Sequence, residues 1–187
     1  ADIFGDTPSY TDFNTNTSIT DDNIKDTVAL WFSDQDRADI VYGHISDWET
    51  SEVTDMSSLF DSSYLSNYEL SSKYFNEDIS SWNTSLITDM SNLFSKKENF
   101  NDNINNWDVS SVTNMCKMFF IASSFNQPLN SWDVSSVTDM DCMFTGASSF
   151  NHPLDLWDVS SVTNMFRMFH KASSFNQFLD SWEVSLV

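Results

Sequence analysis

Acidic side chains recur at a fixed interval in this sequence, which makes them the first candidates for binding chemistry. Asp108, Asp133 and Asp158 each follow a tryptophan, and Glu183 follows the next tryptophan 25 residues later. If the repeats stack about 4.8 Å apart, as neighbouring strands do, these carboxylates form one outward column. Two bare carboxylates at that spacing repel by about 3 kcal/mol at an effective dielectric of roughly 20, so the column needs compensation.

Two kinds of compensation fit the residue pattern. In the first, each aspartate accepts N–H bonds from the serines that follow it, as in an Asx turn, and the column is structural. In the second, Asp108, Asp133, Asp158 and Glu183 bind calcium or a basic protein partner. The sequence leaves both open, and calcium is the one cofactor that it suggests.

Enzymatic chemistry finds no support in the residue pattern. His44, His152 and His170 share no motif or metal-ligand spacing, and no serine stands in a nucleophile-elbow sequence. Only three glycines are present, too few for a phosphate-binding loop. We therefore predict a protein without catalytic activity.

The charge balance restricts the partners. With 28 acidic and 8 basic residues the net charge is −20, which repels nucleic acid and anionic membrane surfaces. No apolar run approaches the ~20 residues of a membrane span, so we expect no membrane insertion. The 40% of hydrophobic residues is enough for a substantial core. We expect a protein partner.

The acidic column belongs to a repeat of 25 residues, and that period predicts a solenoid of stacked units. We expect a short strand around each tryptophan and a short helical turn after it. Thr113, Thr138 and Thr163 are the expected N-caps of these helical turns, because Met and Phe follow at i, i+3 and i+4 spacing. The aligned Met and Phe residues should form the core. An aligned asparagine column, from Asn76 to Asn176, should bind backbone groups of neighbouring units.

The sequence divides into three regions, the last of which holds the repeats. Residues 1–19 read as a polar arm, residues 20–44 as a helical N-terminal cap, and residues 45–187 as the solenoid repeats, with an insertion at about 61–70. In the cap, Thr20 or Asp21 is the expected N-cap of an amphipathic helix.

Candidate partner-binding residues lie where the repeat is interrupted. The insertion offers Tyr64, Leu65 and Tyr68, although packing of the tyrosines onto the helical cap explains them equally well. Leu156 stands in an outward column that is otherwise polar. These residues are candidates because loops and apolar side chains that break a regular array are typical recognition elements.

The last unit supplies two further candidates, Leu186 and Val187. The sequence stops before another helical turn, so we expect partial exposure of the core formed by Met165, Met168, Phe169 and Phe175. Such an end would associate with a second copy end to end or be capped by a partner, unless Leu186 and Val187 cover it themselves.

The repeat unit reads W-D-V-S-S-V-T-[DN]-M-x-x-M-F-x-x-A-S-S-F-N-[QH]-P-L. It occurs at residues 107–129, 132–154 and 157–179, with Phe178 replacing the proline in the last of these. This unit resembles the BspA-like leucine-rich-repeat surface protein family. The family is also described as a lipoprotein-associated 25-residue repeat of unknown function. The resemblance implies a leucine-rich-repeat solenoid with a role in adhesion or protein binding, and no catalytic site. Asn83 and the residues after it depart from the repeat, as do nine extra residues between Trp48 and Trp82.

The expected function is therefore a non-catalytic protein-binding or adhesion module of a surface or lumenal protein. The alternative is a structural subunit docked on a larger assembly, membrane-associated or not. We expect an extracellular or cell-surface location, or an organelle lumen after removal of a targeting peptide. Cys116 and Cys142 are one position out of register in adjacent repeats, which fits either a disulfide between units or two free thiols.

Overall fold

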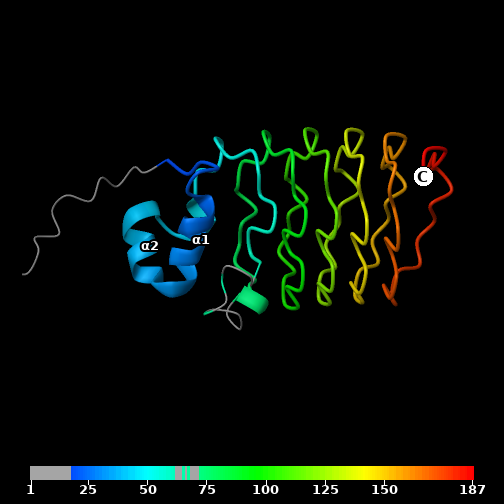
Figure 1. Ribbon diagram of the computed structural model, residues 1–187. Helices are drawn as coiled ribbons and strands as arrows, with labels where there is room; N and C mark the ends of the chain where they lie inside the picture. The colour runs from blue at the N-terminus through cyan, green and yellow to red at the C-terminus, as the bar shows by residue number, and fades with distance from the viewer. Residues whose placement is uncertain (1–17, 62–64, 66, 68–71) are drawn as a thin grey trace, which may run out of the picture.

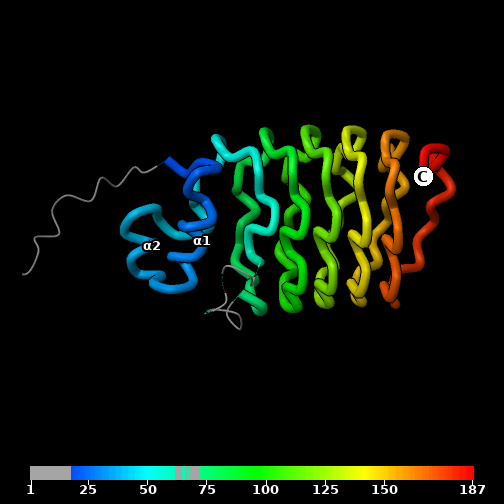
Figure 2. Tube along the Cα trace, in the orientation of Figure 1, coloured from blue at the N-terminus to red at the C-terminus, as the bar shows by residue number. Residues whose placement is uncertain are grey.

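The computed structural model describes residues 18–61, 65, 67 and 72–187. The chain begins with helices α1 (Ile24–Ser33) and α2 (Gln35–Tyr42), followed by the 3₁₀ turn η1 (Ile45–Asp47). Figure 1 shows these helices at one end of a row of stacked coils, and the trace in Figure 2 follows the coils side by side to the C-terminus. We call each 25-residue repeat unit a coil. The expected arm lies outside the described residues, apart from residues 18–19.

Helix α1 packs against the first coil through an apolar stripe. Ile24, Val28 and Trp31 are buried, and the Trp31 ring meets the Trp48 ring edge-on with centroids 6.0 Å apart. The predicted N-cap is wrong, because the helix starts after Asn23 without a side-chain cap. The spacing of apolar residues correctly predicts a helix here, but not where it begins.

Asp21 joins the helical segment to the first coil instead of capping α1. Its carboxylate accepts hydrogen bonds from Thr54 N (2.7 Å), Thr54 Oγ1 (2.6 Å) and Asp55 N (3.1 Å). Partial burial opposes ionisation, but these three bonds outweigh it and lower the pKa of Asp21. A charged acceptor therefore fixes the junction between helices and coils.

The predicted leucine-rich-repeat solenoid, with a short strand and a short helical turn in each unit, is wrong. Residues 75–187 contain neither helix nor strand. Adjacent coils meet there in isolated parallel bridges between single residues, such as Asp89 with Asn114 and Asn114 with Asp139. The coils are built from turns, and their pairing is too short to form a sheet.

Two adjoining four-residue turns replace the predicted helical turn. Met118 N donates to Met115 O (3.1 Å) and Ala122 N donates to Phe119 O (3.0 Å). The third residue of each turn has a positive φ, 55° at Lys117 and 56° at Ile121, as a type II turn requires. The residues at the turn ends are buried. The apolar spacing i, i+3, i+4 thus arises from the ends of consecutive turns and not from a helix.

The threonines expected to cap helices instead connect the coils. Thr113 N donates to Thr88 O (2.9 Å), and Thr138 N donates to Thr113 O (2.8 Å). The hydroxyl of each donates to the same carbonyl, at 3.2 Å in both cases. The series continues at Thr163, which bonds to Thr138 in the same way. These residues align successive coils.

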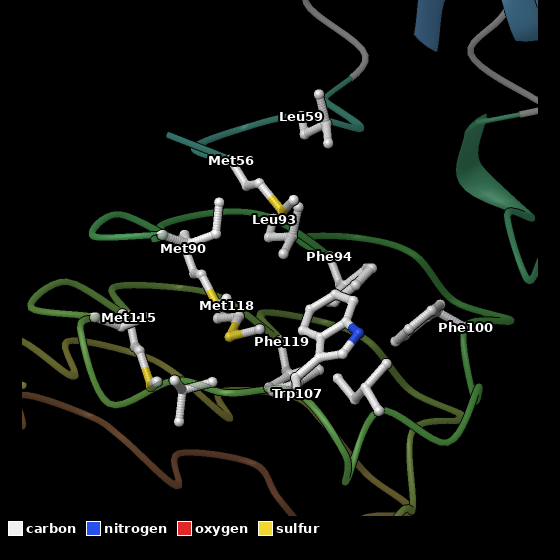
Figure 3. Packing of buried hydrophobic residues seen from close by; sticks show 14 of the residues in the cluster. Met56, Leu59, Met90, Leu93, Phe94, Phe100, Trp107, Met115, Met118 and Phe119 are labelled. Atoms are coloured by element: carbon white, nitrogen blue, oxygen red, sulfur yellow. The ribbon is translucent and has the colours of Figure 1, made fainter. Parts of the chain in front are cut away.

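The core consists of aromatic and methionine columns that run along the stack, as Figure 3 shows for several coils. Phe94 and Phe119 stack with ring centroids 5.7 Å apart, and Phe119 and Phe144 at 5.4 Å. Trp132 is buried and donates its indole N–H to Ile104 O (3.2 Å). The predicted Met and Phe core is confirmed.

The asparagine prediction is also confirmed. Asn101 Oδ1 accepts the backbone N–H of Asn126 (2.8 Å), and Asn126 Oδ1 accepts that of Asn151 (3.0 Å). Each amide therefore satisfies a backbone donor of the next coil, which fixes the spacing of the turns.

Candidate binding surfaces

The predicted acidic column consists of exposed residues that stabilise turns. Asp108 Oδ1 accepts hydrogen bonds from Ser110 N (3.0 Å) and Ser110 Oγ (2.6 Å). Asp133 makes the same pair of bonds to Ser135, and Asp158 accepts from Ser160 N (3.0 Å). This is the Asx-turn geometry.

These hydrogen bonds also favour the ionised carboxylate. The Ser110 hydroxyl and then its backbone N–H hold the pKa of Asp108 below the usual value, and partial burial opposes them only weakly. Ser160 lowers the pKa of Asp158 in the same way. The serines therefore supply part of the compensation that closely spaced carboxylates need.

The calcium alternative has no organised ligand group to support it. Within residues 18–61, 65, 67 and 72–187, no three His, Cys, Asp or Glu side chains are grouped so as to hold a metal ion. Glu183, the last member of the predicted site, is exposed. The geometry of Asp108, Asp133 and Asp158 favours the turn-stabilising interpretation, and calcium binding stays a prediction to be tested.

A second polar column, at the bridges between coils, was not among the predicted sites. Asp89, Asn114 and Asp139 occupy aligned positions, and Asn114 Nδ2 donates to Asp89 Oδ2 (2.9 Å). Each also accepts the N–H two residues later, as Asn114 Oδ1 does from Cys116 N (3.0 Å). The recurring T-[DN]-M of the repeat could have revealed this column, because Asp and Asn favour such local bonds.

Both cysteines lie beside one carboxylate. Cys116 Sγ donates to Asp141 Oδ2 (3.7 Å), and Cys142 Sγ donates to Asp141 Oδ1 (3.3 Å). Both thiols are free. Burial, followed by the nearby charges of Asp139 and Asp141, raises the pKa of Cys116 to about 11. Burial and the hydrogen bond to Asp141 raise the pKa of Cys142.

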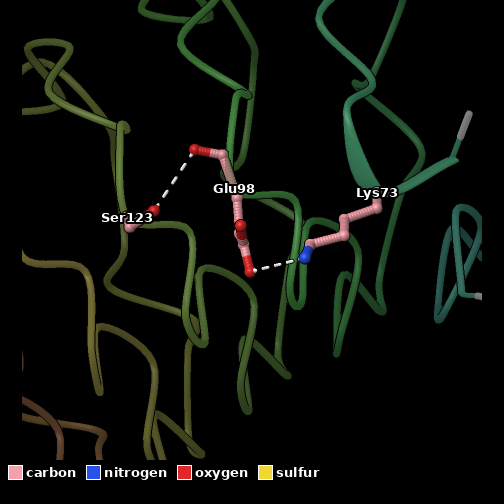
Figure 4. A network of polar contacts seen from close by, with 3 residues as sticks. All are labelled: Lys73, Glu98 and Ser123. Atoms are coloured by element: carbon pink, nitrogen blue, oxygen red, sulfur yellow. Dashed lines mark hydrogen bonds and ion pairs between the residues drawn. The ribbon is translucent and has the colours of Figure 1, made fainter. Parts of the chain in front are cut away.

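Near the insertion, a small polar network joins consecutive coils (Figure 4). Lys73 Nζ lies 3.2 Å from Glu98 Oε1, and both side chains are more than a third exposed. The backbone carbonyl of Glu98 accepts from Ser123 Oγ (3.4 Å) and Ser124 N (3.1 Å). Solvent screens the ion pair, so the backbone contacts determine the geometry of this edge.

The predicted partner-binding residues differ in their exposure to solvent. Tyr64 and Tyr68 lie outside the described residues. Leu65 is completely buried in the core, so it has no surface with which to contact a partner. Leu156 is 72% exposed, and Leu186 and Val187 are also exposed.

Two phenylalanines were missed as surface candidates. Phe178 is 82% exposed and Phe166 is 62% exposed, the first at a position that is proline in the two preceding coils. Together with Leu156 they form what we call the exposed apolar set. Each replaces a residue that is smaller or polar in aligned repeats, and that departure was visible in the sequence.

The last coil covers its aromatic residues less completely than the preceding one. Phe169, Phe175 and Trp182 are half-buried, whereas the residues aligned with them 25 positions earlier, Phe144, Phe150 and Trp157, are buried. The expected partial exposure is therefore present at Met165, Phe169 and Phe175, but the expectation is wrong for Met168, which is buried. Neither described helix, α1 nor α2, is long and apolar enough to cross a bilayer.

The fold and surfaces define a repeat protein of stacked coils. A family model described as "Mycoplasma protein of unknown function, DUF285" matches three overlapping segments, residues 11–85, 27–127 and 63–182. These segments cover most of the sequence, so the chain belongs to this family. No curated protein and no solved structure matches it.

Proposed function

We propose that this chain is a non-catalytic protein-binding or adhesion module of a BspA-like surface protein. Membership of the DUF285 family is consistent with a repeat protein of the cell surface. The proposed location is extracellular or at the cell surface, and the proposed partner is another protein.

The exposed apolar set is the observation that supports protein binding. Leu156, Phe166 and Phe178 lie within the last two complete coils and expose large apolar side chains to solvent. Exposed aromatic and aliphatic groups that are not needed by the core contribute to binding when a partner removes them from water. Charge favours a partner that is neutral or basic, because the chain itself has a net charge of −20.

A variant with repeat-consensus residues tests this proposal. Leu156→Ser, Phe166→Asp and Phe178→Pro introduce residues found at the aligned positions 131, 141 and 153. Beads coated with the triple variant should adhere at least about tenfold less to cells of the source organism than beads coated with the unmodified protein.

The matched control is Leu86→Ser. Leu86 is 53% exposed, and serine occupies the aligned positions 111, 136 and 161, but Leu86 lies several coils away from the exposed apolar set. Its adhesion should equal that of the unmodified protein. Equal adhesion of the triple variant would reject the proposal. Copurification of the natural protein in fixed stoichiometry with a large assembly would instead favour the structural-subunit alternative.

A further inference from the structure

The register of the coils places Cys116 and Cys142 diagonally across one coil boundary. Cys116 aligns with Asp141, the residue before Cys142, and Lys117 N donates to Asp141 O (2.8 Å) across the same boundary. A spacing of about 4.8 Å between coils and about 3.8 Å between consecutive Cα atoms gives a diagonal Cα separation of about 6 Å. Disulfides span Cα separations of roughly 4.4–6.8 Å, so this diagonal is of a length that a bridge can span.

The two thiols also point towards a common group. Their Sγ atoms lie 3.7 Å and 3.3 Å from the two oxygens of the Asp141 carboxylate. A rotation of each side chain away from Asp141 would bring the sulfur atoms towards each other without breaking the backbone bond from Lys117.

We propose that Cys116 and Cys142 form a thiol-oxidation site, in which a small-molecule disulfide converts the two thiols into a disulfide bridge between adjacent coils. Cys116 is the residue that attacks the reagent, because it is partly exposed. Cys142 is only 8% exposed, which suits the second step, in which it attacks the sulfur of Cys116 and not the reagent in solution.

The reaction proceeds by two exchanges. Cys116 loses its proton and attacks one sulfur of the reagent, whose S–S bond breaks and releases one thiolate. Cys142 then loses its proton and attacks the sulfur of Cys116, which expels the second half of the reagent. The two expelled thiolates take up the two protons. Two protein thiols are oxidised to one disulfide, and one reagent disulfide is reduced to two thiols.

The acidic surroundings affect the rate and the choice of reagent. Asp139 and Asp141 help to keep Cys116 protonated at neutral pH, so oxidation is slow there and accelerates as pH rises towards about 11. The negative charge of the chain attracts a cationic reagent such as cystamine. A slowly formed structural bridge of this kind suits an oxidising compartment.

Peptide mapping of the full chain tests the site. Trypsin cleaves after Lys97, Lys117 and Arg167, which places the two cysteines on separate peptides, residues 98–117 and 118–167. After incubation of the native protein with cystamine, the intact mass should fall by about 2 Da and the two peptides should be found joined. The melting temperature should rise by several degrees, because the bridge closes a loop.

The single-cysteine variants separate the two roles. Cys142→Ser should accumulate a stable cystamine adduct at Cys116, whereas Cys116→Ser should react far more slowly. Asp141→Asn should accelerate bridge formation several-fold at pH 7, because it removes a negative charge beside both thiols. A persistent cystamine adduct on Cys116 of the unmodified protein, without joined peptides, would overturn the proposal. Joined peptides together with an unchanged rate in Asp141→Asn would overturn the influence assigned to Asp141.

Discussion

Individual residues in the paired turns adopt left-handed backbone conformations, mostly without glycine. Lys96, Lys117, Ile121 and Cys142 have φ between 53° and 60°, whereas Gly146 is the glycine at an equivalent turn position. A left-handed conformation costs a non-glycine residue about 1–2 kcal/mol. The hydrogen bonds and buried turn ends of each coil must offset that cost.

Positions 96 and 146 are aligned in the repeat, so two substitutions measure this cost. One replaces a strained residue by glycine, and the other replaces glycine by a residue that is strained there. Lys96→Gly should raise the free energy of unfolding by about 0.5–1 kcal/mol, since relief of backbone strain exceeds the added entropy of glycine in the unfolded chain. Gly146→Ala should lower it by about 1 kcal/mol or more, because the new Cβ lies 3.2 Å from Ile121 Cγ1 at a φ of 73°. Urea unfolding measures both. Changes of the same sign would contradict the strain argument.

The ionisation of Asp108 gives a prediction about pH. Because its folded pKa is lowered, Asp108 stabilises the fold above its unfolded pKa, and that contribution is lost as pH falls through the folded pKa. Protonation of other carboxylates also relieves repulsion in a chain of net charge −20, so the site is best followed by NMR titration of the Asp108 carboxyl. Ser110→Ala should raise this pKa towards its ordinary value. An unchanged pKa in the variant would rule out the Ser110 hydroxyl as a cause, because the backbone N–H of residue 110 is still present.

Calcium titration decides between the two interpretations of the acidic column. With Oδ1 of Asp133 already bonded to Ser135, we expect calcium to raise the melting temperature of the unmodified protein and of Asp133→Asn equally, through screening alone. Sodium chloride at equal ionic strength is the control. A larger rise with calcium that Asp133→Asn abolishes would establish a specific site.

At the scale of elements, the sequence predicts which residues are buried better than how the backbone runs. The 25-residue period and the Met and Phe columns are sufficient to identify the core, because burial depends on residue type and spacing. The prediction of a helical turn is wrong because paired four-residue turns bury apolar residues with the same i, i+3, i+4 spacing. Lys117 and Ile121 occupy positions where a turn usually has glycine, so the pattern typical of a type II turn is absent from most repeats.

The contribution of one coil to the core is measured by tryptophan truncation. Trp132→Ala removes a buried ring and leaves Ile104 O without its indole donor, so the free energy of unfolding should fall by about 3–5 kcal/mol. Trp182→Ala should cost distinctly less, because Trp182 is only half-buried. Denaturant unfolding of both variants provides the comparison. Equal losses would mean that burial in the stack does not govern stability.

In the whole molecule, contacts run between neighbouring coils, from the helices at one end to the last coil at the other (Figure 1). The hydrogen bonds of Thr113 and Asn126 each reach only the adjacent coil. Stability in such an array is close to a sum of local and nearest-neighbour contributions. A perturbation at the junction of helices and coils should therefore remain near that junction.

Asp21→Ala tests this locality. The variant removes the acceptor of Thr54 N, Thr54 Oγ1 and Asp55 N, and hydrogen bonds to a charged group contribute about 1.5–3 kcal/mol when buried and less at an exposed site. Hydrogen exchange should accelerate at the amides of Thr54 and Asp55, while amides of residues 132–157 keep their protection. Asp22→Ala, at an exposed neighbouring position, should leave exchange unchanged. Uniform acceleration in all coils would show instead that the chain unfolds as one cooperative unit.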